Sequence, residues 1–354
     1  MSARGLLALC AVLLAAPIPL HAQSVVTAPA FPAEPLLEAL RTRWLHRARI
    51  DWATAEPALR ATLDTASTDA SRAAAFVALF ERAGDVHSRF VWQGRAHSHW
   101  EGMEEPERQR LLAIMPREHA ASGRPHGRML RDHVAYVLVP GMPAGSPGEV
   151  RALAESLHVQ VGALASKRPR GWIVDLRLNG GGNLYPMLVG LAPLLGDGVV
   201  GGTAEADRTI VQRWVLRAGA LLWRDASGDR EFASLGRPQR GSEATKPVAV
   251  LLGPLTRSSG QALALAFRGR ARTVLMGEPT APGYATVTAP VDMGEGLLLT
   301  LTVGGMTDRA DRGCDGVVLP DTLVSGRDDF DDPLQDATVQ AALEWLGRTS
   351  RGGR

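Results

Sequence analysis

The sequence predicts an α/β protein that begins with a small helical region, and three observations support this fold class. Apolar residues recur at helical spacing over residues 31–82. Beyond residue 133, short apolar runs typical of buried strands alternate with stretches typical of helices. The chain has 354 residues, 45% of them hydrophobic, which is enough to bury a large core. We therefore expect one large domain with a smaller helical companion.

Residues 1–22 predict a cleaved export signal. Arg4 supplies a positive charge, and residues 6–20 form an apolar stretch that is short for a membrane span. Small residues around Ala22 suit a cleavage site. The apolar run continues well past Cys10, so we do not expect a lipid anchor there. No later stretch approaches the roughly 20 apolar residues of a membrane helix. We expect a periplasmic or secreted protein without stable membrane insertion.

Residues 23–132 predict a helical N-terminal domain followed by a polar linker. Leucine and tryptophan recur at three- and four-residue steps near its start. The linker, residues 92–131, contains four histidines, which are His97, His99, His119 and His126. His97 and His99 could bind a metal together with Glu101, but their spacing matches no recognised metal site. We interpret this stretch as a surface loop and expect no metal.

Residues 133–348 predict the core of the protein. Four apolar runs predict strands, at 134–139, 171–178, 247–252 and 273–276. Helical patterns follow or separate them, at 150–164, 184–195, 262–268 and 334–346. Two alternating stretches around a glycine-containing turn predict a hairpin, at 284–291 and 297–303. Residues 208–240 show no clear pattern, and we leave them unassigned.

Charge and cysteine content exclude several functions. Lysine plus arginine total 39 and aspartate plus glutamate total 37, so the net charge of +2 gives no basic surface for nucleic acid. Cys314 is the only cysteine after the signal, so neither an internal disulfide nor a zinc ribbon can form. We interpret Cys314, which has no histidine beside it, as a structural thiol.

Ser258 is the candidate nucleophile. It lies in Thr256-Arg257-Ser258-Ser259-Gly260, between a predicted buried strand and a predicted helix. A helix N-terminus has free N–H groups and partial positive charge, so the amide of Ser259 could stabilise an oxyanion. These residues could also simply cap the helix, and the segment alone leaves both interpretations open.

The segment Asn179-Gly180-Gly181-Gly182 predicts a second turn of the same kind. It also follows a buried strand and precedes a helix, so its amides are available as donors. The segment matches neither of the common glycine patterns for phosphate binding. Two such turns facing each other across one cleft could form an oxyanion hole from two amides.

His87 is the best-placed base for the serine hydroxyl, which needs one to become a nucleophile. The only lysines are Lys167 and Lys246, and each precedes a predicted strand. The strand after Lys246 puts that lysine roughly 20 Å from Ser258. His87 lies in Gly84-Asp85-Val86-His87-Ser88, at the end of the helical region. A purely structural role for His87 stays open at this point.

Four separated motifs together resemble the tail-specific, or C-terminal processing, family of serine peptidases. In chain order they are Asp85 to Ser88, Gly171 to Gly182, Thr256 to Gln261 and Gly316 to Asp321. The resemblance implies a β-α spiral core like that of the Clp protease and crotonase folds. It also implies Ser258 as nucleophile and His87 as the base of the tricorn-like branch. The oxyanion hole would consist of the Ser259 amide and a glycine amide, which we expect from Gly181 or Gly182.

Three departures from the family pattern limit what the resemblance implies. The segment after Gly277-Glu278-Pro279-Thr280 contains no lysine, so the serine-lysine dyad of the better-known branch is absent. Gln261 stands where many relatives have glutamate. No stretch is long enough for the separate peptide-binding (PDZ) module of many members, so we do not expect true tail specificity.

We therefore predict an exported serine endopeptidase that acts on peptides or unfolded protein and needs no cofactor. The carboxylates that could orient His87 are those of Asp85, Glu278, Asp308 and Asp311. Two other functions fit the same residues, a hydrolase of small esters and a non-catalytic protein that binds peptides or lipophilic molecules. The oligomeric state lies beyond the sequence.

Overall fold

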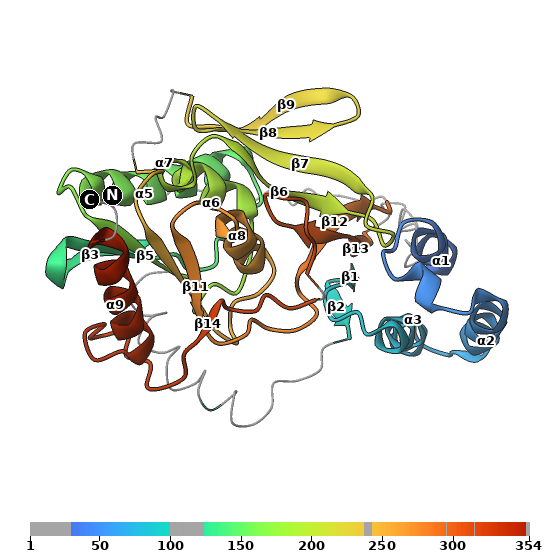
Figure 1. Cartoon of the computed structure of the whole chain (residues 1–354). Coiled ribbons are helices and arrows are strands. Elements are labelled where there is room, and N and C mark those ends of the chain that lie inside the picture. Colours follow the sequence, from blue (N-terminus) through green and yellow to red (C-terminus); the bar gives the residue numbers. More distant parts are fainter. Residues whose placement is uncertain are drawn as a thin grey trace, which may run out of the picture. The chain divides into compact units, whose positions relative to one another are not determined.

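Two β-sheets and the helices that pack on them form an α/β fold, as the sequence predicts (Figure 1). The computed structural model describes residues 30–99, 109, 124–236, 243–294, 296–314 and 316–351. From residue 32 onward these belong to a single unit, Pro32–Arg354. Among the described residues, no helix has the length and apolar character that a bilayer crossing requires.

The first sheet has six strands in the order β14-β11-β10-β5-β4-β3. Their bounds are β3 His126–Leu130, β4 Val134–Leu138, β5 Gly171–Asp175, β10 Val248–Leu252, β11 Thr273–Gly277 and β14 Thr322–Leu323. All neighbouring pairs are parallel except β3 with β4. Because β5 and β10 are parallel neighbours, the turns that follow them emerge at the same edge of the sheet.

Helices cover both faces of this sheet, so its central strands are buried throughout. One face carries α5 Pro147–Ala165, α6 Leu184–Gly190, α7 Ala192–Leu195 and α8 Ser259–Phe267. The other face carries α9 Ala337–Arg351. Alternate residues of each strand face the two layers, with Val174 and Val250 toward α8 and Ile173 and Leu251 toward α9. This two-sided burial explains why the sequence shows continuous apolar runs here.

The second sheet is antiparallel, with the order β2-β1-β13-β6-β7-β8-β9 and with β12 also paired to β13. Its strands are β1 Arg89–Trp92, β2 Arg95–Ser98, β6 Gly198–Ala204, β7 Ile210–Arg217, β8 Ala220–Asp225, β9 Gly228–Ala233, β12 Thr286–Asp292 and β13 Leu298–Thr307. The β12–β13 pair is the hairpin that the sequence predicts. Strand β13 joins the N-terminal part of the chain, through β1, to the core, through β6.

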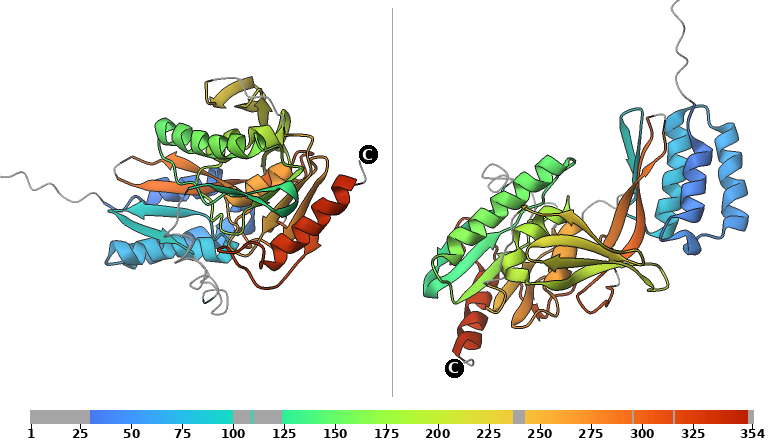
Figure 2. Two further views of the ribbon diagram at one scale, coloured as in Figure 1. Left: turned by 90° about the vertical axis from the view of Figure 1, so that its left-hand side faces the viewer. Right: turned by 90° about the horizontal axis from the view of Figure 1, so that it is seen from above.

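Within residues 30–88, three α-helices precede the first strand, in line with the expected helical region, and they are α1 Ala33–Thr42, α2 Trp52–Thr65 and α3 Asp69–Ala83. Thr68 caps α3, and Gly84 ends it in the left-handed conformation, with φ 65°. The chain after α1 is tied to the second sheet because the Leu45 N–H donates to the Thr302 carbonyl, 2.9 Å away. Figure 2 shows the β1–β2 and β12–β13 hairpins beside these helices.

The structure places one segment that the sequence left unassigned and corrects another. Residues 208–240 contain strands β7 to β9, and β9, the edge strand, is exposed over most of its length. The expected surface loop at His97 is strand β2, where the His97 ring stacks on Phe90 with centroids 5.0 Å apart. The expected linker also contains β3, an edge strand with partly exposed side chains. His119 and Glu101 lie outside the described residues, among which no cluster of potential metal ligands occurs.

A buried ion-pair cluster fixes the end of β5, just before the glycine turn. The Arg177 side chain is 5% exposed and contacts Asp175 and Asp336, which are fully buried. The Arg177 guanidinium also lies over the Phe330 ring, 4.6 Å from its centroid. Because a buried arginine without these carboxylates would be strongly destabilising, the cluster holds the C-terminal segment against the strand end.

Candidate active site

Ser258 lies at a sharp turn between β10 and α8, where the sequence predicts it. Its backbone has φ 50° and ψ −118°, a conformation that L-residues rarely adopt. Such strain costs about 1–3 kcal/mol and is found most often at functional sites, including the nucleophile turns of other serine hydrolases. Thr256 supports the turn: its hydroxyl donates to the Leu176 carbonyl and accepts from the Gly253 N–H.

The turn after β5 packs directly against the Ser258 turn. The Arg257 N–H donates to the Asn179 carbonyl at 2.9 Å, and the Ser259 hydroxyl donates to the Gly182 carbonyl at 2.6 Å. A Cβ atom placed on Gly181 would lie 2.8 Å from the Ser258 Cβ and 3.3 Å from its Oγ. The two turns therefore meet at the Ser258 side chain, which is the arrangement the sequence analysis expected.

The amides available for an oxyanion hole are those of Ser259 and Gly182. The Gly181 N–H, one of the two expected glycine donors, is used inside the turn, where it donates to the Asn179 Oδ1 at 3.0 Å. Within the described part of the chain, no acceptor is bonded to the Ser259 or Gly182 N–H. Gly181 has φ 105°, so its contribution is the close approach to Ser258 and not a hydrogen bond.

Gln261 connects the nucleophile turn to the segment that leads into β12. Its Oε1 accepts from the Ser258 N–H at 3.1 Å, and its Nε2 donates to the Thr280 hydroxyl and the Ala281 carbonyl. The Ala281 N–H in turn donates to the Thr256 carbonyl. An amide can make both kinds of bond at once, whereas a carboxylate only accepts, so Gln261 fits this position better than the glutamate of many relatives.

His87 lies on the turn after α3, and Asp85 fixes the backbone of that turn. The Asp85 carboxylate is 1% exposed and accepts from the N–H groups of His87 and Ser88 and from the side chains of Trp44, Ser88 and Thr302. Burial alone would raise the pKa of Asp85, but the hydrogen bonds from Ser88 and Trp44 outweigh it and hold the pKa below its usual value. Asp85 therefore orients the main chain of His87 and not its ring.

The His87 ring contacts two residues that the sequence analysis did not select. Its Nδ1 is 2.8 Å from the Thr286 hydroxyl, and its ring packs edge-on against Tyr284, with centroids 5.2 Å apart. The same Tyr284 ring lies under the Arg257 guanidinium, 5.5 Å away, so one aromatic side chain contacts both the base and the neighbour of the nucleophile. The hydrogen bond that the described structure gives to the His87 ring is the one to Thr286, and no bond joins the ring to Ser258. Hydrogen bonds between a catalytic base and its nucleophile often form only when substrate binds.

Burial sets the charge state of His87. Desolvation lowers the pKa of His87 to about 4, with Asp85 acting in the opposite direction and Arg89 adding to the decrease. The side chain remains partly exposed, so water offsets some of this effect. The imidazole is therefore neutral at pH 7 and can accept a proton.

Two of the other carboxylates expected to orient His87, those of Asp308 and Asp311, are paired with arginines. Asp308 accepts from the Arg312 guanidinium and from the Ala310 and Arg312 N–H groups. Asp311 pairs with Arg213 at 2.7 Å. Glu278 follows β11, where its N–H donates to a β10 carbonyl. The hydroxyl of Thr286 thus occupies the place that we expected a carboxylate to take. No local signal marks this residue, because it is one polar residue of an ordinary-looking strand.

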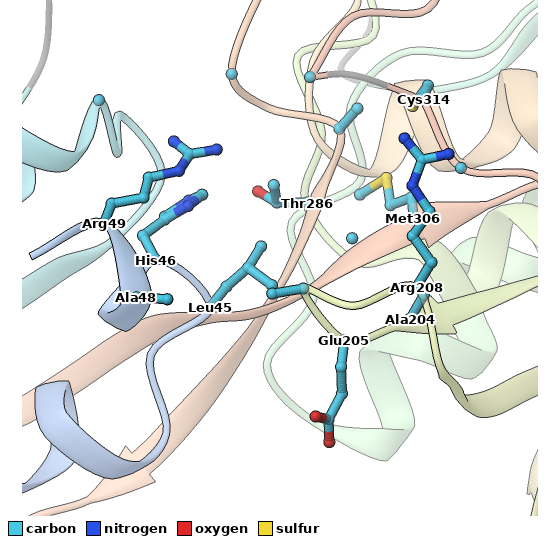
Figure 3. A pocket seen from close by; sticks show the side chains of 17 residues that line it. Leu45, His46, Ala48, Arg49, Ala204, Glu205, Arg208, Thr286, Met306 and Cys314 are labelled. Atoms are coloured by element: carbon cyan, nitrogen blue, oxygen red, sulfur yellow. The ribbon is translucent and has the colours of Figure 1, made fainter.

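A cavity of about 530 Å³ opens on the Thr286 side of the site (Figure 3). His46 and Arg49, from the segment after α1, form one wall, and Met306 and Arg208 lie across from them. Cys314 also lines this cavity, while Ser258 does not. Lys246 pairs with Glu243 at 2.7 Å before the start of β10, at the opposite end of that strand from Ser258, as the sequence analysis expected.

Comparison with known proteins assigns the class and then the family. The nucleophile turn, together with a match to a peptidase family, defines the class as a serine-type peptidase. Residues 133–324, more than half of the chain, match "Peptidase family S41", and the chain therefore belongs to this family. The family resemblance carried by the four sequence motifs is thereby confirmed.

Individual relatives agree with this assignment. The nisin-resistance protein of Lactococcus lactis subsp. lactis is 34% identical over 140 residues, which are 39% of this chain and about two fifths (41%) of that relative. A lipoprotein from Streptococcus agalactiae has a similar fold, with a TM-score of 0.64 and 19% identity over 91% of this chain and 98% of the other. The photosystem II D1 C-terminal processing protease gives a TM-score of 0.50 and 16% identity over 84% and 94% of the two chains.

Proposed function

We propose that this peptidase is an exported endopeptidase that cleaves peptides or unfolded protein through an acyl-enzyme at Ser258. The observation that carries the proposal is the strained Ser258 turn, packed against Gly181 and hydrogen-bonded to the glycine turn at two points. A protein that only bound peptides would have no need of backbone strain at a serine whose neighbouring N–H groups are left without acceptors.

In the proposed mechanism, His87 is the base. Its Nδ1–H donates to the Thr286 hydroxyl, which leaves the Nε2 lone pair to take the Ser258 proton. The Ser258 Oγ then attacks the peptide carbonyl, and the N–H groups of Ser259 and Gly182 stabilise the oxyanion. His87 returns the proton to the leaving amine, and water, deprotonated by His87, hydrolyses the acyl-enzyme.

Other parts of the proposal rest on the sequence. We place the mature protein in the periplasm or outside the cell, after removal of residues 1–22. We divide it into a helical and linker region, 23–132, and a peptidase core, 133–348, which would follow the Clp/crotonase-like spiral. The absence of the serine-lysine dyad and of a separate peptide-binding module argues against true tail specificity.

Labelling with a fluorophosphonate probe tests this function. Wild-type protein should take up one label per chain, and Ser258→Ala should take up none, while both should unfold at similar temperatures. The wild type should also fragment an unstructured protein such as reduced, carboxymethylated α-lactalbumin, and nisin, for which a relative is named, belongs in the same assay. Absence of label from folded wild-type protein would favour the binding protein. Label with cleavage of activated esters alone would favour the ester hydrolase.

A further inference from the structure

A second cavity, of about 510 Å³, lies between α5, α6 and β9. Backbone and small side chains of residues 145–147 line one side, and Val150 and Val189 contribute apolar surface. Tyr185 and Phe232 line the rest together with Asn183. The volume lies in the range of pockets that bind small organic ligands or peptide side chains.

Aromatic rings form one wall of this cavity. The Phe232 ring stacks on Trp223 with centroids 4.0 Å apart and an interplanar angle of 13°, and it contacts Tyr185 at 4.2 Å. Phe232 nevertheless remains 41% exposed, which is unusual for a phenylalanine that already contacts two aromatic rings. An aromatic surface that is rigid and still open to solvent gains free energy when another apolar group covers it.

The cavity and the candidate active site lie on either side of the same glycine turn along the chain. Gly182 supplies a proposed oxyanion donor, and Asn183, the next residue, lines the cavity. A Cβ atom placed on Gly181 would lie 3.3 Å from the Ser258 Oγ. With about 3.8 Å between consecutive Cα atoms, the Asn183 Cα lies within about 12 Å of that oxygen. An extended peptide advances about 3.3 Å per residue, so this distance corresponds to at most four substrate residues.

We infer that this cavity, here named the aromatic subsite (Val150, Arg151, Asn183, Tyr185 and Phe232), binds one large apolar side chain of the substrate, within four residues of the scissile bond. The inference rests on the proposed function and adds the substrate class that the enzyme prefers. Aromatic side chains should bind best, because they stack on Phe232 and Tyr185. Arg151 is the charged residue of the lining, so lysine or arginine at this substrate position should be disfavoured.

Mapping of cleavage sites tests the aromatic subsite. Wild-type protein is incubated with reduced, carboxymethylated α-lactalbumin, and the products are identified by mass spectrometry. One position within four residues of the cut should be enriched in phenylalanine, tyrosine, tryptophan and leucine and depleted of lysine and arginine. A quenched fluorescent peptide built on the best site should lose about tenfold in kcat/KM when that residue becomes glycine. Uniform cleavage without any such position would overturn the inference.

Variants of Phe232 link the preference to the subsite. Phe232→Ala should lower kcat/KM for the aromatic peptide about tenfold and leave the glycine peptide unaffected, while Phe232→Leu should restore most of the loss. Val159→Ala is the matched control, because Val159 is 55% exposed on α5 and does not line the cavity. Fluorophosphonate labelling should be the same in all three variants. Equal losses on both peptides would contradict the subsite, whereas loss of label from the wild type would instead refute the proposed function.

Discussion

The turns around Ser258 are brought together by the pairing of two central strands, 77 residues apart at the Ser259–Gly182 contact, whereas His87 is held by residues about 200 positions along the chain. Asn179 and Arg257 follow adjacent parallel strands, so their turns meet as soon as β5 and β10 pair. The His87 ring, by contrast, bonds to Thr286, 199 residues later, and its turn is anchored through Asp85 to Thr302, 217 residues away. The position of the base thus depends on the β12–β13 hairpin and on contacts of the N-terminal helices.

This difference has a physical consequence for the enzyme. The oxyanion turns belong to a sheet that is buried on both faces, so they can move only if the core opens. His87 belongs to a segment attached to the β12–β13 hairpin and not to that sheet, so a shift of the hairpin would change its distance to Ser258. We expect substrate binding to move the segment that carries His87 and to leave the turns that carry Ser258 and Gly182 unchanged.

The largest expected effect comes from removing the base. His87→Gln should reduce kcat for peptide cleavage about 10³-fold, because glutamine cannot take the Ser258 proton as the imidazole does in the proposed mechanism. The thermal unfolding temperature should change little, since the ring is partly exposed. His97→Gln, on the outer β2 strand, is the matched control and should retain full activity. Wild-type rates for His87→Gln would show that another group is the base.

Gly181→Ala tests the nucleophile side and should cost about 10²-fold in kcat. The new Cβ would lie 2.8 Å from the Ser258 Cβ, at a backbone φ of 105° that alanine rarely adopts. Gly180→Ala is the control in the same turn. A Cβ on Gly180 meets nothing within 4 Å, and its N–H already donates to the Leu178 carbonyl. If both variants had equal activity, Gly181 would not contact the nucleophile as the structure places it.

The smallest expected effect comes from Thr286, which orients the base from the far end of the chain. Thr286→Val keeps the shape but removes the hydroxyl, so the His87 tautomer is no longer selected and kcat/KM should fall about tenfold. Thr286→Ser retains the hydroxyl and should stay close to wild type. If Val and Ser lowered the rate equally, the effect of residue 286 would be packing and not orientation of the imidazole.

The pH dependence of peptide cleavage tests the environment of the His87 ring. Because the folded-state pKa of His87 is lowered toward 4, activity should be present above that pKa and be lost as pH falls through it, well below 6.5. Thr286→Asp would place a negative charge beside Nδ1 and should move the acid limb of kcat/KM upward. A wild-type acid limb at pH 6.5 or above would contradict the desolvated environment of His87.

The sequence by itself determined the parts of the site that follow buried strands. Continuous apolar runs followed by glycine or serine turns predicted β5, β10 and the two turns, and Ser258 and Gly182 lie where they were expected. These features are local: each turn is specified by residues within a few positions of it. The β12–β13 hairpin was also predicted, because the alternation of apolar and polar residues in its strands and the glycines in its turn are local signals.

Only the tertiary structure decided how the base is oriented and which glycine can donate. Thr286 meets His87 because two distant strands bring them together, and no nearby residue marks that contact. The Gly181 amide is lost as a donor because the Asn179 side chain folds back onto it. The ribbon β7 to β9, which carries Phe232, was missed for a related reason, since its strands pair with one another and their apolar residues become buried only when they pack on the core. Contacts between residues remote in sequence leave no periodic pattern, and in this protein those contacts orient the base and form the aromatic subsite.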